Sequence, residues 1–225
     1  MLFVRDAPAT TTIPHIGTRL KLAASDVRDT LRDISRRRDV WLFLVAYWCY
    51  IDGVDTIVVM AVDYGLSLGL HTNALITALL ITQFVGFPAA LAFGKLGERF
   101  GAKAGIFVAI GVYTGVIVYA TQIHSEQQFM ILAAIIGLVQ GGIQSLSRAL
   151  FSCMIPNDRA AQYFGFYNLL GKFAAILGPT LVGVVTVTTG SARFGMLSIA
   201  VLFFIGAICL YSVNTTKNRL PGVDQ

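Results

Sequence analysis

Six apolar runs, each close to the length that crosses a lipid bilayer, constrain the fold of this 225-residue chain. A transmembrane α-helix needs about 20 consecutive apolar residues. The runs lie at residues 40–61, 74–93, 104–121, 129–155, 163–188 and 194–213. Only 13% of the residues are charged, whereas an average soluble domain has about 25%. The sequence therefore predicts an all-α membrane protein with six transmembrane helices in one domain, residues 40–213.

The loops between these runs differ strongly in charge. Arg193 is the only base in the loops on one side of the expected bilayer. The bases on the other side are Arg36–Arg38, Lys95, Arg99, Lys103, Arg159, Lys217 and Arg219. Because lysine and arginine accumulate in cytoplasmic loops, we expect a multi-pass protein of the cell membrane with both termini, including the tail at residues 214–225, in the cytoplasm.

Residues 1–39 form a polar segment that we expect to be cytoplasmic. Val27, Leu31 and Ile34 share one helical face, while acidic and basic residues occupy the others. Ser25 is a suitable N-cap. The pattern predicts a short helix near residues 25–38 that lies on the membrane surface with its bases near the lipid headgroups. Acidic residues interleave with these bases, so nucleic acid is not an expected partner.

Polar side chains occur in only some of the apolar runs. The first run holds Asp52 and Asp55, the fourth holds Gln140, Gln144 and Arg148, and the fifth holds Asn168 and Lys172. An ionisable residue inside a membrane span is costly and usually faces a pathway or a partner. We therefore expect the first, fourth and fifth helices to line an interior, and the third and sixth helices to face outward.

The charged residues of these runs are predicted to lie at similar depths. At about 1.5 Å rise per residue, Arg148 lies roughly 12 Å from Pro156, and Lys172 lies roughly 13 Å from residue 163. Our hypothesis is an intramembrane network of Asp52 and Lys172, with Asp55 and Arg148 nearby. Such a network binds a zwitterionic or anionic solute, or couples transport to protons.

Each of these residues also has an alternative interpretation. Asp52 and Lys172 can form a purely structural ion pair, and Arg148 can extend its long side chain to the cytoplasmic headgroups. Asp55 can face a water-filled outer vestibule. The three amide side chains can contact a solute or can hydrogen-bond between helices.

A glycine-rich and charged motif separates the second and third runs. Residues 94–103 read GKLGERFGAK and fit the pattern G-x-x-x-[DE]-R-x-G-x-[RK]. The residues that we assign to this signature loop are Gly94, Gly97, Glu98, Arg99, Gly101 and Lys103. We expect Gly94 and Gly101 to allow a tight cytoplasmic turn, Glu98 to favour a helix N-terminus or a neighbouring base, and the two bases to hold the loop in the cytoplasm.

Small residues and prolines predict details of the helix packing. Gly111 and Gly115 are four residues apart, as are Gly137 and Gly141, and this spacing allows helix backbones to approach closely. Pro88 and Pro179 lie inside runs and are expected to kink their helices.

The motif at residues 94–103 resembles the signature of the major facilitator superfamily. The stretches GGIQSLSR at residues 141–148 and FGFYNLLGK at residues 164–172 are similar to the second half of its vacuolar effluxer-like branch, which is related to autophagy-linked amino-acid permeases. This resemblance implies helices seven to twelve of a twelve-helix transporter. It also implies a central cavity lined by the first, fourth and usually the fifth helix of this half, and a second six-helix half as partner.

The resulting functional expectation is transmembrane transport of a small solute, amino-acid-like or otherwise polar or anionic, as the C-terminal half of a secondary transporter. The missing half is expected from a separate chain or from a homodimer. The alternative is a non-transporting membrane remnant or interaction protein. An enzyme is not expected, because all three histidines lie outside the apolar runs, and no cofactor or metal site is expected.

Overall fold

The computed structural model of the protein describes residue 28 and residues 30–214, except for the side chains of Leu96, Glu98 and Phe100. The expectations for Ser25, Val27, Lys217 and Arg219, and for the tail after residue 214, fall outside these residues. In chain order the elements are α2 (Arg38–Ser67), α3 (Thr72–Phe100), α4 (Ala102–Ala120), α5 (Glu126–Ser152), η1 (Asn157–Arg159), α6 (Ala160–Ala174), α7 (Leu177–Thr189), α8 (Ala192–Ser198) and α9 (Ala200–Tyr211). Within the described part of the chain, six helical stretches are long and apolar enough to cross a membrane, which confirms the prediction of six spans.

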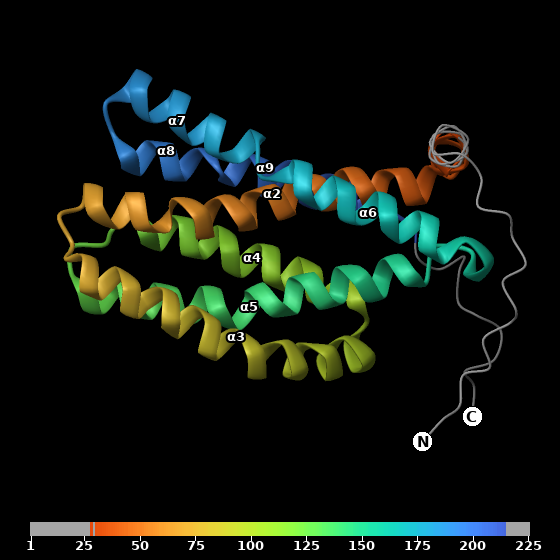
Figure 1. The fold of residues 1–225 in the computed structure, drawn as a ribbon, viewed down its shortest axis with the longest axis horizontal. Coiled ribbons are helices and arrows are strands. Elements are labelled where there is room, and N and C mark those ends of the chain that lie inside the picture. Colours follow the sequence, from red (N-terminus) through yellow and green to blue (C-terminus); the bar gives the residue numbers. More distant parts are fainter. Residues whose placement is uncertain (1–27, 29, 215–225) are drawn as a thin grey trace, which may run out of the picture.

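The helices run side by side along the long axis of the molecule (Figure 1). α5 packs chiefly against α3 and α4, and α2 packs chiefly against α9 and α6. Stacked aromatic rings join the two groups, with Phe43 of α2 and Phe151 of α5 at a centroid distance of 5.8 Å. The pair Tyr113 of α4 and Phe203 of α9 has a distance of 5.4 Å. All four side chains are fully buried.

The signature loop is mostly helical, which corrects the expectation of a loop across residues 94–103. α3 continues to Phe100 and α4 begins at Ala102, so Gly101 alone makes the turn, with φ of 87°. Only glycine adopts that conformation readily. Gly94 lies within α3 and faces open space, whereas a Cβ on Gly97 would lie 2.2 Å from a methyl carbon of Leu146. Gly97, rather than Gly94, therefore provides the close helix approach.

One of the two expected glycine pairs packs tightly and the other does not. A Cβ on Gly137 would lie 2.6 Å from the backbone oxygen of Thr82, and one on Gly141 would lie 2.7 Å from Cβ of Ala90. Both contacts join α5 to α3. Gly111 and Gly115 face open space on α4, so the same spacing marks a helix contact only where a neighbouring helix lies on that face.

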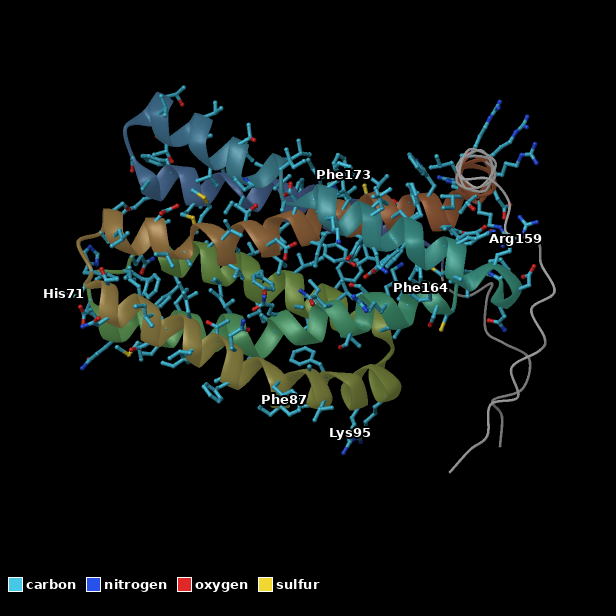
Figure 2. All side chains as sticks on the ribbon, in the orientation of Figure 1. His71, Phe87, Lys95, Arg159, Phe164 and Phe173 are labelled. Carbon is cyan, nitrogen blue, oxygen red and sulfur yellow. The ribbon has the colours of Figure 1, made fainter. Side chains whose placement is uncertain are left out.

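The two prolines have different effects on their helices. α3 contains Pro88 and continues through it, and it changes direction midway, near Phe87 (Figures 1 and 2). The fifth span is interrupted instead, because α6 ends at Ala174 and α7 begins at Leu177. Pro179 lies in the first turn of α7, where its missing N–H breaks no helical hydrogen bond.

Burial differs widely among the spans. α2 and α5 are the most buried, α4 and the α8–α9 span are intermediate, and α3 and the α6–α7 span are the least buried. The fifth span was expected to line an interior with the first and fourth. Its low burial shows that the six helices by themselves leave this span largely uncovered.

Residues 30–36 are helical and precede α2. This helix is seen end-on in Figure 1, so it crosses the direction of the bundle. Thr30 and Ile34 form its buried face, whereas Leu31, expected on that face, is 38% exposed. Asp33 accepts a hydrogen bond of 2.6 Å from the Tyr163 hydroxyl, which fastens the helix to the start of α6. This hydrogen bond, together with the charge of Arg37, holds the pKa of Asp33 below its ordinary value.

Candidate functional site

Asp52 forms a buried contact between α2 and the interruption in the fifth span. Its side chain is 1% exposed, and its Oδ2 accepts a hydrogen bond of 2.9 Å from the backbone N–H of Gly178. Gly178 is the second residue of α7. Its amide therefore belongs to the first turn of a helix, where amides lack helical partners and favour a negative charge.

Thr56 and Gly178 complete this contact. A Cβ on Gly178 would lie 1.8 Å from the Thr56 hydroxyl oxygen and 3.1 Å from Asp52 Oδ1. Only a residue without a side chain fits there. Asp52 Oδ1 and the Thr56 hydroxyl are both buried and have no hydrogen-bond partner among the described residues. Buried polar atoms of this kind are rare and call for an explanation.

Aromatic side chains fill the space between α2, α5 and α6. The rings of Tyr47 and Tyr167 stack at a centroid distance of 4.1 Å, and Tyr167 stacks on Phe151 at 5.0 Å. The hydroxyls of Tyr50 and Ser147 lie 2.7 Å apart. These contacts fix α6 against α2 and α5 on one side and leave its opposite side uncovered.

Two stripes of polar residues lie on the exposed sides of α5 and α6. Gln144 and Arg148 are exposed on α5, and Asn168 and Lys172 are exposed on α6. Each pair is four residues apart, so its members share one helical face. Gln140, one turn before Gln144, is half-buried. We call Gln144, Arg148, Asn168 and Lys172 the polar face.

Asp52 and Lys172 are not joined by an ion pair in the described residues. Asp52 is buried against Gly178, whereas Lys172 points to the surface because Tyr167 and Ala174 occupy the buried side of α6. Asp55 is half-buried. The sequence suggested that these charges share a depth, but the rotation of α6 separates the two proposed centres of the network.

The profile of the family described as "Vacuole effluxer Atg22 like" matches residues 1–221. The chain belongs to the Atg22-like vacuole effluxer family. This family assignment confirms the resemblance found in the sequence.

Several relatives support the assignment of this Atg22-like chain. It is 42% identical over 200 residues to the "Uncharacterized MFS-type transporter YxiO" of Bacillus subtilis, covering 85% of this chain and 47% of the relative. It is 26% identical over 211 residues to "Autophagy-related protein 22-1" of Aspergillus terreus, covering 86% of this chain and 34% of the relative. The chain thus spans less than half the length of these relatives.

Among the signature residues of this Atg22-like chain, Lys103 hydrogen-bonds to the end of another helix. Lys103 donates hydrogen bonds to the backbone oxygens of Val213 and Tyr211 at 2.5 and 3.2 Å, so it caps the C-terminus of α9. Asp39 accepts a hydrogen bond of 3.1 Å from the backbone N–H of Asn214. Arg99 is exposed, and the Glu98 side chain lies outside the described residues. Lys103 therefore links α4 to α9 in addition to its expected effect on orientation.

Sequence reasoning missed Thr56 and Gly178. Thr56 lies four residues after Asp52, and Gly178 directly precedes Pro179. The pair Gly178-Pro179 was a usable signal, because it favours an interrupted helix. The pairing of that interruption with Asp52 depends on how α2 and α7 pack, and no local pattern in the sequence shows this.

Proposed function

We propose that this chain is one six-helix half of a secondary transporter for a small polar or anionic solute. The observation that carries the proposal is the polar face. Arg148 and Lys172 stand on exposed sides of helices that are otherwise apolar enough to cross a membrane. Charged groups at such depths are costly against lipid and therefore face water or protein.

A second six-helix half would cover the polar face and the exposed apolar surfaces beside it. The α6–α7 span and α3 are the least buried spans, and both have apolar side chains on their exposed surfaces. Phe173 is 54% exposed on α6, and Phe87 is 75% exposed on α3 (Figure 2). The partner is a separate chain or a second copy. In the assembled protein the polar face becomes one wall of an aqueous cavity between the halves.

The charges of the polar face favour a solute with a carboxylate or another anionic group. Arg148 and Lys172 have no ion pair within the described part of the chain. An unpaired guanidinium binds a carboxylate through two parallel hydrogen bonds. Asn168 and Gln144 supply neutral donors and acceptors beside these cations. An amino-acid-like solute fits this set, with half-buried Asp55 as the acidic group for its ammonium and Asp55 or Asp52 as the group that responds to a coupling proton.

We propose that the chain lies in a cell membrane with both termini on the cytoplasmic side. The bases of the α3–α4 turn and the helix at residues 30–36 lie at the same end of the bundle as η1 (Figures 1 and 2). Arg193 lies at the opposite end, on α8. This distribution follows the positive-inside rule.

The test combines the mass of the assembly with solute uptake. The chain, purified from membranes in mild detergent, is expected to have the mass of two six-helix halves and, in proteoliposomes, to take up a labelled amino acid. Arg148→Gln and Lys172→Gln are expected to lower uptake more than tenfold, whereas Lys95→Gln, an exposed base away from the polar face, is the matched control. A mass of one 24.3 kDa chain without uptake would support the alternative of a non-transporting membrane protein and contradict the proposal.

A further inference from the structure

The interruption between α6 and α7 is held together by a side chain from another helix. We propose that Asp52 is the site at which the protein binds a proton, and that proton binding there releases α7 from α2. The proposal deepens the transport function proposed above, because it names the element that moves when the coupling group changes charge. It rests on the geometry of Asp52, Thr56 and Gly178.

The backbone at the interruption lacks the usual helical hydrogen bond of Gly178. In a continuous helix the N–H of Gly178 would donate to the carbonyl oxygen of Ala174, four residues earlier. Here the Ala174 oxygen instead accepts a hydrogen bond of 2.8 Å from the Ile176 N–H. Asp52 Oδ2 takes its place as the acceptor for Gly178. The carboxylate of α2 therefore substitutes for the missing hydrogen bond of the fifth span.

The other oxygen of this carboxylate is available to a proton. Asp52 Oδ1 and the Thr56 hydroxyl are buried without hydrogen-bond partners in the described residues, and both lie against Gly178. A proton bound to Oδ1 converts the carboxylate to a neutral carboxylic acid, and no other bond forms or breaks. A proton needs no cavity, which suits a contact that has no space even for a Cβ atom.

Protonation of Asp52 weakens its contact with the first turn of α7. The ionised carboxylate is attracted by the N-terminal end of the α7 dipole, and a hydrogen bond to a charged acceptor is stronger than one to a neutral acceptor. The neutral acid retains an acceptor oxygen, but it is no longer attracted by the α7 dipole and its hydrogen bond to Gly178 is weaker. α7 then turns about Ala175 and Ile176, whose backbone angles already depart from those of α6.

Other ionisable groups lie on the elements that pack near Asp52, and the response of α7 to pH must be distinguished from theirs. They include Cys49 and Asp55 together with Tyr47 and Tyr50 on α2, Tyr113 on α4, Arg148 on α5, Lys172 on α6, Arg193 on α8 and Cys209 on α9. α7 itself has no ionisable side chain. Asp52 is also the only carboxylate within the described residues that contacts α7 through a hydrogen bond. A response of α7 to pH is therefore assigned to Asp52.

Distance measurement by pulsed electron paramagnetic resonance tests this proposal without any solute. Spin labels are attached at Val59→Cys on α2 and Val187→Cys on α7, which are 61% and 84% exposed, after Cys49, Cys153 and Cys209 have been replaced by alanine. The protein with native Asp52 is expected to show a distance distribution that shifts between about pH 8 and about pH 5. Asp52→Asn, which imitates the protonated acid, is expected to give the low-pH distribution at both values. Asp63→Asn, an exposed acid on the same helix, is the control and should behave like the native protein.

Two results would overturn the proposal: an unshifted distribution in the native protein, or a shift in Asp52→Asn equal to the native one. If Asp52→Asn does not fold, amide hydrogen exchange in the native protein decides the question. The first turn of α7 should then exchange at least fivefold faster at about pH 5 than at about pH 8, after correction for the intrinsic rate, and an unchanged rate would contradict it. A pH-dependent shift without any solute uptake would retain this inference while rejecting the transport function.

Discussion

The hydroxyls of Tyr50 and Ser147 lie 2.7 Å apart in the buried contact between α2 and α5. Ser147 also donates to the carbonyl oxygen of Ile143, one turn earlier on α5. A serine hydroxyl has a single hydrogen to donate, so Tyr50 donates to Ser147. Because Tyr50 is the donor and Ser147 the acceptor, removing one hydroxyl should not cost the same free energy of unfolding as removing the other.

Ser147→Ala is expected to destabilise the protein more than Tyr50→Phe. The alanine leaves the fully buried Tyr50 hydroxyl without an acceptor, which costs about 1–3 kcal/mol. Tyr50→Phe removes the donor, and Ser147 keeps its bond to Ile143, so the expected cost is about 1 kcal/mol. Unfolding free energies from detergent denaturation measure both values. The double variant should be no less stable than Ser147→Ala alone, and equal single effects would contradict the assigned direction.

Gly178→Ala is expected to disrupt the contact of Asp52 with α7. The added Cβ would lie 1.8 Å from the Thr56 hydroxyl, and overpacking of this kind costs about 1–3 kcal/mol. Gly183→Ala on the same helix meets open space and is the matched control, with an unchanged or slightly raised melting temperature. Thermal denaturation measures both, and equal melting temperatures for the two variants would show that Gly178 is not tightly enclosed.

The contact of Asp33 with Tyr163 is expected to lose its stabilising effect only at acid pH. The pKa of Asp33 lies below its ordinary value of 3.8 in the folded protein, so ionised Asp33 stabilises the fold at pH values above that ordinary pKa. The stabilisation falls as the pH drops through the lower, folded-state value. Asp33→Asn should therefore lower the melting temperature near neutral pH, and its difference from the native protein should shrink below about pH 4.

Asp63→Asn provides the comparison for that experiment, because Asp63 is exposed and has no ion pair within residues 30–214. Its effect should be small at every pH. A difference for Asp33→Asn that stays constant down to about pH 3 would mean that the charge of Asp33 does not stabilise the contact.

Lys103→Met is expected to loosen the end of α9. The substitution removes two hydrogen bonds to the backbone oxygens of Tyr211 and Val213, and charge-assisted bonds of this kind contribute about 1.5–3 kcal/mol. Hydrogen exchange at residues 208–214 should accelerate at least tenfold. Lys95→Met, which removes an exposed base from the same stretch at residues 94–103, should leave that exchange unchanged. Equal acceleration in both variants, or none in Lys103→Met, would contradict the stabilising role of these two hydrogen bonds.

The sequence predicted the spans well because the membrane imposes a simple rule on them. Apolar runs of sufficient length become helices whatever their neighbours are, and the spans Arg38–Ser67 and Thr72–Lys95 enclose the expected runs at residues 40–61 and 74–93. Gly101 at the turn could also be predicted, because a positive φ favours glycine.

The rotation of each helix could not be predicted in the same way. Asp52 and Lys172 were expected to meet, yet Tyr167 occupies the buried side of α6 and stacks on Tyr47. Lys172 is therefore exposed, and Asp52 instead contacts a backbone amide. The choice between ring stacking and an ion pair depends on long-range packing, and neither the spacing nor the depth of the residues determines it.

Thiol reactivity at the polar face tests most directly the claim that this face borders an aqueous route between two halves. Arg148→Cys and Lys172→Cys, each in a background without native cysteines, are treated with a membrane-impermeant cationic thiosulfonate in proteoliposomes. Val108→Cys on α4, whose native side chain is 57% exposed, serves as the lipid-facing reference. We predict that both substituted positions react at least tenfold faster than the Val108 position, and that a transported solute slows them. Reaction no faster than at the Val108 position would contradict the claim, because it would place the polar face against lipid.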